Sequence, residues 1–202
     1  RVSFRSGPKS PVENGLLIFA GGNLEGRKGV AIVLHALVKL RNDGVPFRFV
    51  YGGQGPEYSS LCGLAKSLGF EEAAVSLGTI FSFDQYRKQL QESHIYLLPS
   101  LRESAGLTLA EAMLSGCVPV VASCGGPAML VTENCGFALP PSNPEDLAQG
   151  IADVLTQLWK SPDLLQRLSH TAVQRVKTYA SEEAYLAGIC EAYAAALHFR
   201  LH

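Results

Sequence analysis

The chain has 202 residues, of which 47% are hydrophobic and 17% charged, and its formal net charge is -1 at pH 7. This length supports one substantial core, and a nearly neutral chain offers no bulk electrostatic attraction for nucleic acid. No apolar run approaches the roughly 20 residues of a membrane span. The five cysteines form no C-x-x-C pair, so we expect free thiols in a reducing, cytoplasmic compartment rather than zinc ligands or disulfides.

A glycine-rich loop with two cations follows the first apolar run. Residues 16–20 are short enough for a buried parallel strand, and the leucines and valines after residue 30 have helical spacing. Between them, residues 21–29 contain Arg27 and Lys28. Glycines let a backbone approach a ligand closely, and lysine offers a mobile positive charge to a diphosphate. The alternative is a solvent-exposed basic turn at a helix start, because lysine and arginine are mostly exposed.

The second strand, residues 47–51, ends in another glycine-rich turn. Pro56 is well placed in it to open a helix that runs to residue 69. The turn lacks the third glycine of a G-x-G-x-x-G fingerprint, which disfavours a Rossmann dehydrogenase. A short strand at residues 75–77 and a helix at residues 83–93 follow.

The junction after the fourth strand, residues 95–98, carries the most chemistry. A polar loop with Glu103 and Gly106 leads into a helix at residues 108–115. Ligands bind at such junctions because free backbone N–H groups and the positive helix end meet there. Glu103 and Glu111 flank the junction, and carboxylates accept hydrogen bonds from sugar hydroxyls.

Both carboxylates also have an ordinary structural interpretation. Residues 108–111 read T-L-A-E, which is a capping box, so Glu111 could simply satisfy the first amide of the helix. Glu103 could equally be a solvated loop carboxylate. The junction by itself leaves both alternatives open.

The fifth strand, residues 118–122, is expected to have Pro119 at its start, because proline cannot donate to a ladder. Asn143 is expected to cap a later helix that has Pro144 at its first position. The remaining elements are expected at residues 125–130 (short helix), 136–139 (strand), and 145–160, 163–179 and 182–201 (helices).

Six strands alternating with helices predict an α/β fold, a doubly wound parallel six-stranded sheet with helices on both faces. We place this Rossmann-like domain at residues 14–160 and assign residues 161–202 to appended C-terminal helices. Residues 1–13 contain Gly, Pro and Ser with little periodicity, and we expect them to be a linker from an N-terminal half that precedes this chain.

The spacing of the two carboxylates carries a family resemblance. Glu103 and Glu111 are separated by seven residues, and Ala112-Met113, Gly116 and Pro119-Val120-Val121-Ala122 follow them. This segment resembles the E-x7-E region of the retaining glycosyltransferases of family 4 (group 1). It lies in the C-terminal, nucleotide-sugar-binding half of their GT-B fold. The Lys28-Gly29 pair and the turn at residues 52–57 are also similar to the family, in the expected order.

The resemblance implies a binding site for a nucleoside diphosphate sugar. Glu103 would hold hydroxyls of the donor sugar, and Glu111 would hold the ribose hydroxyls. Lys28 would neutralise the diphosphate. Arg27 supplies a second charge, since the family's arginine falls where Asn23 stands, or Lys28 acts alone. The residues implied to bind donor are Gly22, Asn23, Arg27, Lys28, Ile80, Glu103, Ser104, Ala105, Gly106, Leu107 and Glu111, with catalytic roles for Lys28 and Glu103.

The implied reaction transfers a sugar from the donor to an acceptor with retention of anomeric configuration. The sequence has no D-x-D motif, and the resemblance implies neither a metal nor a cofactor. The acceptor, a glycan, a lipid or a small molecule, would bind largely to the missing N-terminal half, so the 202-residue chain should transfer little sugar. A role in polysaccharide biosynthesis and a cytoplasmic location follow from the resemblance, with peripheral membrane association of the intact enzyme left open.

Two other classes of function remain. One is a nucleotide-sugar-binding module without transfer activity, in which replacing Lys28 or Glu103 would not affect the product. The other is a sugar-phosphate epimerase-like α/β enzyme, which would share the doubly wound design, and fold alone does not separate them. An epimerase needs a general base, but the sequence pairs neither His35 nor His94 with a second acid–base group.

Overall fold

A single parallel sheet organises the chain. The computed structural model describes residues 15–78, 82–104 and 106–179. Within these ranges the strands have the order β3-β2-β1-β4-β5-β6, and all neighbouring strands are parallel. The strands are β1 (Leu16–Gly21), β2 (Phe47–Gly52), β3 (Val75–Leu77), β4 (Ile95–Leu98), β5 (Val118–Ala122) and β6 (Phe137–Leu139). The predicted doubly wound six-stranded sheet is confirmed.

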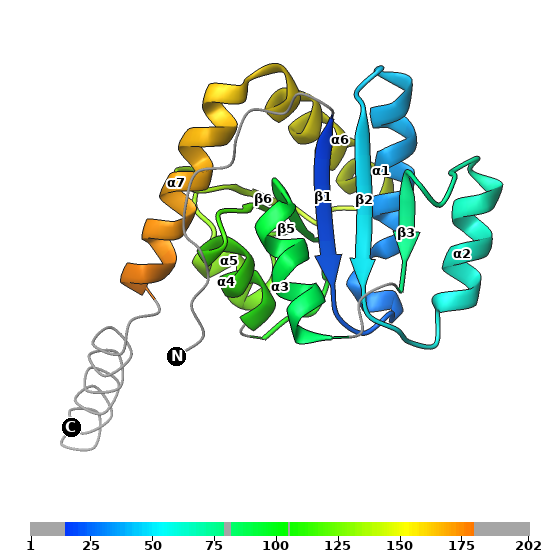
Figure 1. Ribbon diagram of the computed structural model, residues 1–202, viewed down its shortest axis with the longest axis horizontal. Coiled ribbons are helices and arrows are strands. Elements are labelled where there is room, and N and C mark those ends of the chain that lie inside the picture. The colour runs from blue at the N-terminus through cyan, green and yellow to red at the C-terminus, as the bar shows by residue number, and fades with distance from the viewer. Residues whose placement is uncertain (1–14, 79–81, 105, 180–202) are drawn as a thin grey trace.

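Helices cover both faces of this sheet (Figure 1). They are η1 (Gly26–Lys28), α1 (Val30–Asn42), α2 (Tyr58–Ser67), α3 (Phe83–Glu92), α4 (Leu107–Leu114), α5 (Gly125–Leu130), α6 (Pro144–Lys160) and α7 (Pro162–Tyr179). Helices α1, α2 and α6 pack on one face, and α3, α4 and α5 pack on the other. Helix α7 begins against the first core and ends against the second.

Strand residues alternate between the two cores. Ile18 and Ala20 belong to the core beneath α1 and α6, whereas Phe19 belongs to the core beneath α3 and α4. All three are buried, since a parallel sheet is covered on both faces. This explains why the strands are continuous apolar runs that could be recognised from sequence.

The prolines and caps near the later strands behave largely as predicted. Pro119 is the second residue of β5. The Val118 N–H donates to His94 O on the β4 side (2.9 Å), so the Pro119 nitrogen faces β6, which pairs only from Val120 onward. Asn143 caps α6 by accepting a hydrogen bond from the Asp146 N–H (2.9 Å).

The prediction that Pro56 opens a helix is wrong. Helix α2 begins at Tyr58 and ends at Ser67, and Pro56 lies in a turn before it. The neighbouring loop holds this turn, because Glu57 donates its N–H to Leu24 O (3.1 Å). A Cβ on Gly55 would lie 2.5 Å from the same oxygen, so the two loops pack with their backbones in contact.

Several predictions concern residues outside the described ranges. These include the linker at residues 1–13 and the last predicted helix, residues 182–201. The boundary at residue 160 stays a prediction. The four cysteines within the described ranges are free thiols. None of the helices described has both the length and the apolar character required to cross a lipid bilayer.

Candidate functional site

The strand order changes direction between β1 and β4. The loop that carries Lys28 and the loop that carries Glu103 meet there. These strands are neighbours, with Ile18 opposite Ile95 and Phe19 opposite Tyr96. The loop after β1 leads to α1 on one face, and the loop after β4 leads to α4 on the other. A crevice for ligands forms at this point in doubly wound sheets. The arrowheads of β1 and β2 in Figure 1 point to the same lower edge, where the site lies.

Main-chain contacts join the two loops. The Leu101 N–H donates to Arg27 O (2.9 Å), and Arg27 Nη1 donates to Arg102 O (3.1 Å). Gly29 has a φ of 68°, and a Cβ there would lie 2.6 Å from Pro99 O. The lysine-bearing loop is therefore held directly against the loop that carries Glu103.

Lys28 and Glu103 form an ion pair across these loops. Lys28 Nζ lies 2.5 Å from Glu103 Oε2, and the two side chains are only 12% and 15% exposed. The alternatives of an exposed basic turn for Lys28 and a solvated carboxylate for Glu103 are therefore wrong. Charges withdrawn from water interact more strongly than exposed ones, so this pair is a well-defined part of the site.

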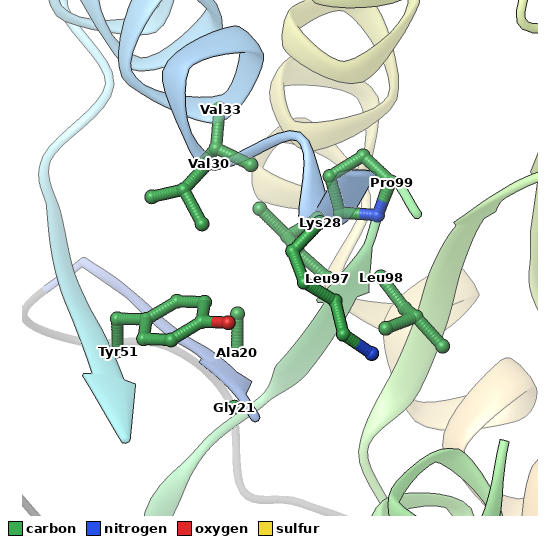
Figure 2. A pocket seen from close by; sticks show the side chains of 9 residues that line it. All are labelled: Ala20, Gly21, Lys28, Val30, Val33, Tyr51, Leu97, Leu98 and Pro99. Atoms are coloured by element: carbon green, nitrogen blue, oxygen red, sulfur yellow. The ribbon is translucent and has the colours of Figure 1, made fainter. Parts of the chain in front are cut away.

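The floor beneath Lys28 is apolar. Figure 2 shows the Lys28 side chain between Tyr51 and Leu98, with Val30 and Val33 above the Tyr51 ring in this view. The hollow that these residues line is too narrow for a water molecule. The walls of this hollow are mostly apolar. The lysine amine therefore makes its polar contact with the Glu103 carboxylate.

Tyr51 is a polar group within this apolar floor. Its hydroxyl lies 3.4 Å from Asn23 O, and burial raises the pKa of Tyr51 above its ordinary value. The phenol therefore stays protonated and neutral beside the ion pair. A Cβ on Gly22 would lie 3.7 Å from Lys28 Nζ and 3.8 Å from the Tyr51 hydroxyl, which places Gly22 next to both groups.

A second ion pair occupies the same loop, and it involves a residue that the sequence did not single out. Arg27 Nε lies 2.6 Å from Glu25 Oε2, and Asn23 donates a hydrogen bond to Glu25 Oε1. The bonds from Arg27 and then Asn23 lower the pKa of Glu25. The Arg27 side chain is 42% exposed. Glu25 thus engages both Asn23 and Arg27, and their role toward a ligand stays a prediction.

Glu111 is not a capping residue. Gly106 occupies the N-cap of α4 with a φ of 65°, and no side chain among the described residues caps this helix. Helix α4 therefore begins at Leu107, one residue earlier than expected, and Glu111 is its fifth residue, too far along to reach back to the cap. Instead, the Tyr86 hydroxyl donates a hydrogen bond of 2.7 Å to Glu111 Oε2. The capping-box interpretation is wrong.

The start of α5 packs against the Glu103 loop. Gly126 donates its N–H to Ser104 O (2.9 Å), and Gly125 lies against the Glu103 carbonyl. Ser104 and Leu107 are exposed. The predicted site residues Ile80 and Ala105 lie outside the described ranges.

The histidines named for an epimerase lie elsewhere. His94 precedes β4, at the edge of the sheet opposite the site, where its Nδ1 accepts the Leu17 N–H (2.9 Å). His35 is exposed on α1. Within the described ranges, no three His, Cys, Asp or Glu side chains gather as metal ligands. The expectation of a reaction without metal or cofactor stays a prediction.

Comparison with known sequences decides the family. The sequence profile of the glycosyl transferases group 1 matches residues 5–175. The chain belongs to this family.

Individual relatives are distant and longer than this chain. The gpi3 subunit of phosphatidylinositol N-acetylglucosaminyltransferase from Schizosaccharomyces pombe is 28% identical over 155 residues, which is 76% of this chain and 33% of the relative. The chain therefore spans about a third of that protein.

Solved structures share the fold. Anabaena HepE, in complex with UDP and glucose, superposes with a TM-score of 0.75 at 20% identity, over 90% of this chain and 49% of HepE. The C-terminal domain of LpcC, a group 1 family protein from Francisella tularensis, superposes with a TM-score of 0.70 at 22% identity, over 85% of this chain and 88% of that domain. At these identities the likeness shows the fold alone, which is one half of a GT-B glycosyltransferase.

Proposed function

We propose that this chain is the donor-binding half of a retaining glycosyltransferase. The observation that carries the proposal is the Lys28–Glu103 ion pair, which places a cation for phosphate and a carboxylate for sugar hydroxyls side by side at the switch point of the sheet. The structure of HepE with UDP and glucose supports a donor of this kind. The ion pair opens when donor binds, and each group then takes its own part of the ligand.

The diphosphate of the donor lies between Lys28 and the start of α4. Helix N-termini present free N–H groups and a partial positive charge, so the amides of Gly106 and Leu107 complement Lys28. Negative charge grows on the diphosphate as the sugar departs. Fixed positive groups in a partly desolvated site stabilise that charge, which is the main catalytic contribution we assign to this chain.

The two carboxylates hold the ends of the donor. Glu103 accepts hydrogen bonds from the sugar hydroxyls, and Glu111 accepts them from the ribose. Gly22 and Asn23 lie in the same loop as Lys28, and Gly22 lies close to the lysine amine. In the retaining reaction, the bond from the anomeric carbon to the leaving phosphate oxygen breaks, and the acceptor oxygen attacks from the same face. The acceptor proton passes to the departing phosphate, so no separate base is needed.

The acceptor site belongs to an N-terminal half that precedes this chain. The 202-residue chain alone therefore binds donor weakly and transfers little sugar. The phosphatidylinositol and the L-malate in the names of two relatives support a lipid or small-molecule acceptor. A glycan acceptor, a role in polysaccharide synthesis and a location in the cytoplasm or at a membrane surface are further parts of the proposal.

Calorimetric titration of the chain with UDP, GDP and ADP tests the proposal. We expect selective binding of one diphosphate, weakened about tenfold by Glu111→Ala because its hydrogen bonds to the ribose are lost. Glu133→Ala is the matched control, since Glu133 is exposed in the turn before β6. Failure of the folded chain and of the longer enzyme to bind any diphosphate at millimolar concentration would refute the proposal.

Replacing Glu103 with glutamine should separate sugar recognition from phosphate recognition. The substitution removes the charge that competes for Lys28, so we expect affinity for the free nucleoside diphosphate to rise about threefold. The preference for the nucleoside diphosphate sugar over the free diphosphate should fall, because a neutral amide binds sugar hydroxyls less strongly. Equal losses of affinity for both ligands would show that Glu103 acts only through the fold.

A further inference from the structure

We propose that Tyr86 is a positioning residue for Glu111, which it holds in the orientation that accepts the ribose hydroxyls of the donor. The inference rests on the proposed function, in which Glu111 binds that ribose. No sequence motif pointed to Tyr86, which lies 25 residues before Glu111 on a different helix.

The geometry of the contact is that of a strong hydrogen bond. The Tyr86 hydroxyl donates to Glu111 Oε2 at 2.7 Å, and both side chains are half-buried. A bond from a neutral donor to an ionised carboxylate is stronger than one between neutral groups. Burial holds the pKa of Tyr86 far above its ordinary value, so the phenol keeps its proton and remains a donor.

The Tyr86 ring is itself held in place. Its centroid lies 5.9 Å from that of Phe19, a fully buried residue of β1, and 6.5 Å from that of Phe83. Helix α3, which carries Tyr86, begins with a reciprocal capping box between Ser82 and Gln85. The direction of the hydroxyl is therefore set by the sheet and by the start of α3, not by Glu111 alone.

The bond fixes which part of the carboxylate remains for a ligand. Among the described residues, Tyr86 is the hydrogen-bond partner of the Glu111 carboxylate, so its other oxygen can accept from a vicinal diol. A free glutamate loses rotamer freedom when it binds, and a side chain that is already ordered avoids that loss. Tyr86 thus improves recognition of the ribose without touching it.

A double-mutant cycle with two ligands tests this role. The proteins are the unmodified chain, Tyr86→Phe, Glu111→Ala and the double variant, and the ligands are the best-binding nucleoside diphosphate and its 2′,3′-dideoxy analogue. We expect Tyr86→Phe to weaken binding of the ribonucleotide about fivefold, to leave binding of the dideoxy analogue unchanged, and to add no loss in the Glu111→Ala background. Tyr179→Phe, which removes an exposed phenol at the end of α7, is the matched control.

The outcomes separate this inference from the proposed function. Normal ribonucleotide binding by Tyr86→Phe, with weakened binding by Glu111→Ala, overturns the role of Tyr86 and leaves that of Glu111 intact. Equal losses for both ligands, or a further loss in the double variant, also overturn it, since they show a structural role. If Glu111→Ala discriminates between the two ligands as well as the unmodified chain does, the ribose assignment of Glu111 fails, and the proposed function must be revised.

Discussion

Replacement of Lys28 with alanine is expected to weaken nucleoside diphosphate binding about 10- to 100-fold, because a charge-assisted contact to phosphate is lost. A second effect acts in the same direction. Glu103, now without the ammonium that lies 2.5 Å away, remains a half-buried carboxylate facing the diphosphate and repels it. Calorimetric titration with the selected diphosphate measures the loss.

Two variants sharpen this test. Lys66→Ala removes an exposed lysine in the last turn of α2, away from the site, and should leave affinity unchanged. The double variant Lys28→Ala/Glu103→Gln should recover part of the affinity, because the repulsion is gone. If Lys28→Ala also leaves sugar transfer by the full-length protein unchanged, a nucleotide-sugar-binding module without transfer activity becomes the better explanation.

Replacement of Gly125 with alanine is expected to lower the free energy of unfolding by about 3 kcal/mol, which corresponds to a fall in Tm of about 6–12 °C. Gly125 has a φ of 57°, where alanine is strained by about 1 kcal/mol. Its Cβ would lie 2.0 Å from Glu103 O, so the backbone of the Glu103 loop must move. Thermal unfolding followed by circular dichroism measures the change.

Two other glycines provide the comparison. Gly44 has a φ of 73° with open space around it, so Gly44→Ala should cost only the backbone strain. Gly63, within α2, has no close neighbour, and Gly63→Ala should stabilise the helix by about 0.5–1 kcal/mol. A loss for Gly125→Ala no larger than that for Gly44→Ala would contradict the close packing of α5 against the Glu103 loop.

Charge pairing within the site explains how so small a region carries two cations. Lys28 is paired with Glu103, and Arg27 is paired with Glu25. The four charges of these two pairs therefore cancel without donor. Because the pairs differ in exposure, we expect donor phosphates to meet a mostly buried cation in Lys28 and a more solvated one in Arg27.

The fold class and the motifs follow from local sequence patterns. The short apolar strands, the helical spacing after each of them and the Asn143–Pro144 cap are local patterns, which depend on residues near one another in the chain. The seven-residue spacing of Glu103 and Glu111 was likewise readable directly, as was the lysine after the first strand. These features were enough to expect both loops at one edge of a parallel sheet.

The contacts of these side chains, in contrast, depend on how distant segments pack together. The partners of Lys28 and Glu111 come from segments 75 and 25 residues away, and strand order and helix packing bring them together. Local patterns also misplaced the starts of α2 and α4. The first is set by a contact between Glu57 and the Leu24 loop, and the second by the left-handed backbone of Gly106. The contacts of Lys28, Glu111 and Glu57 join segments that are far apart in the sequence, so the neighbours of these residues are fixed by topology rather than by adjacent residues.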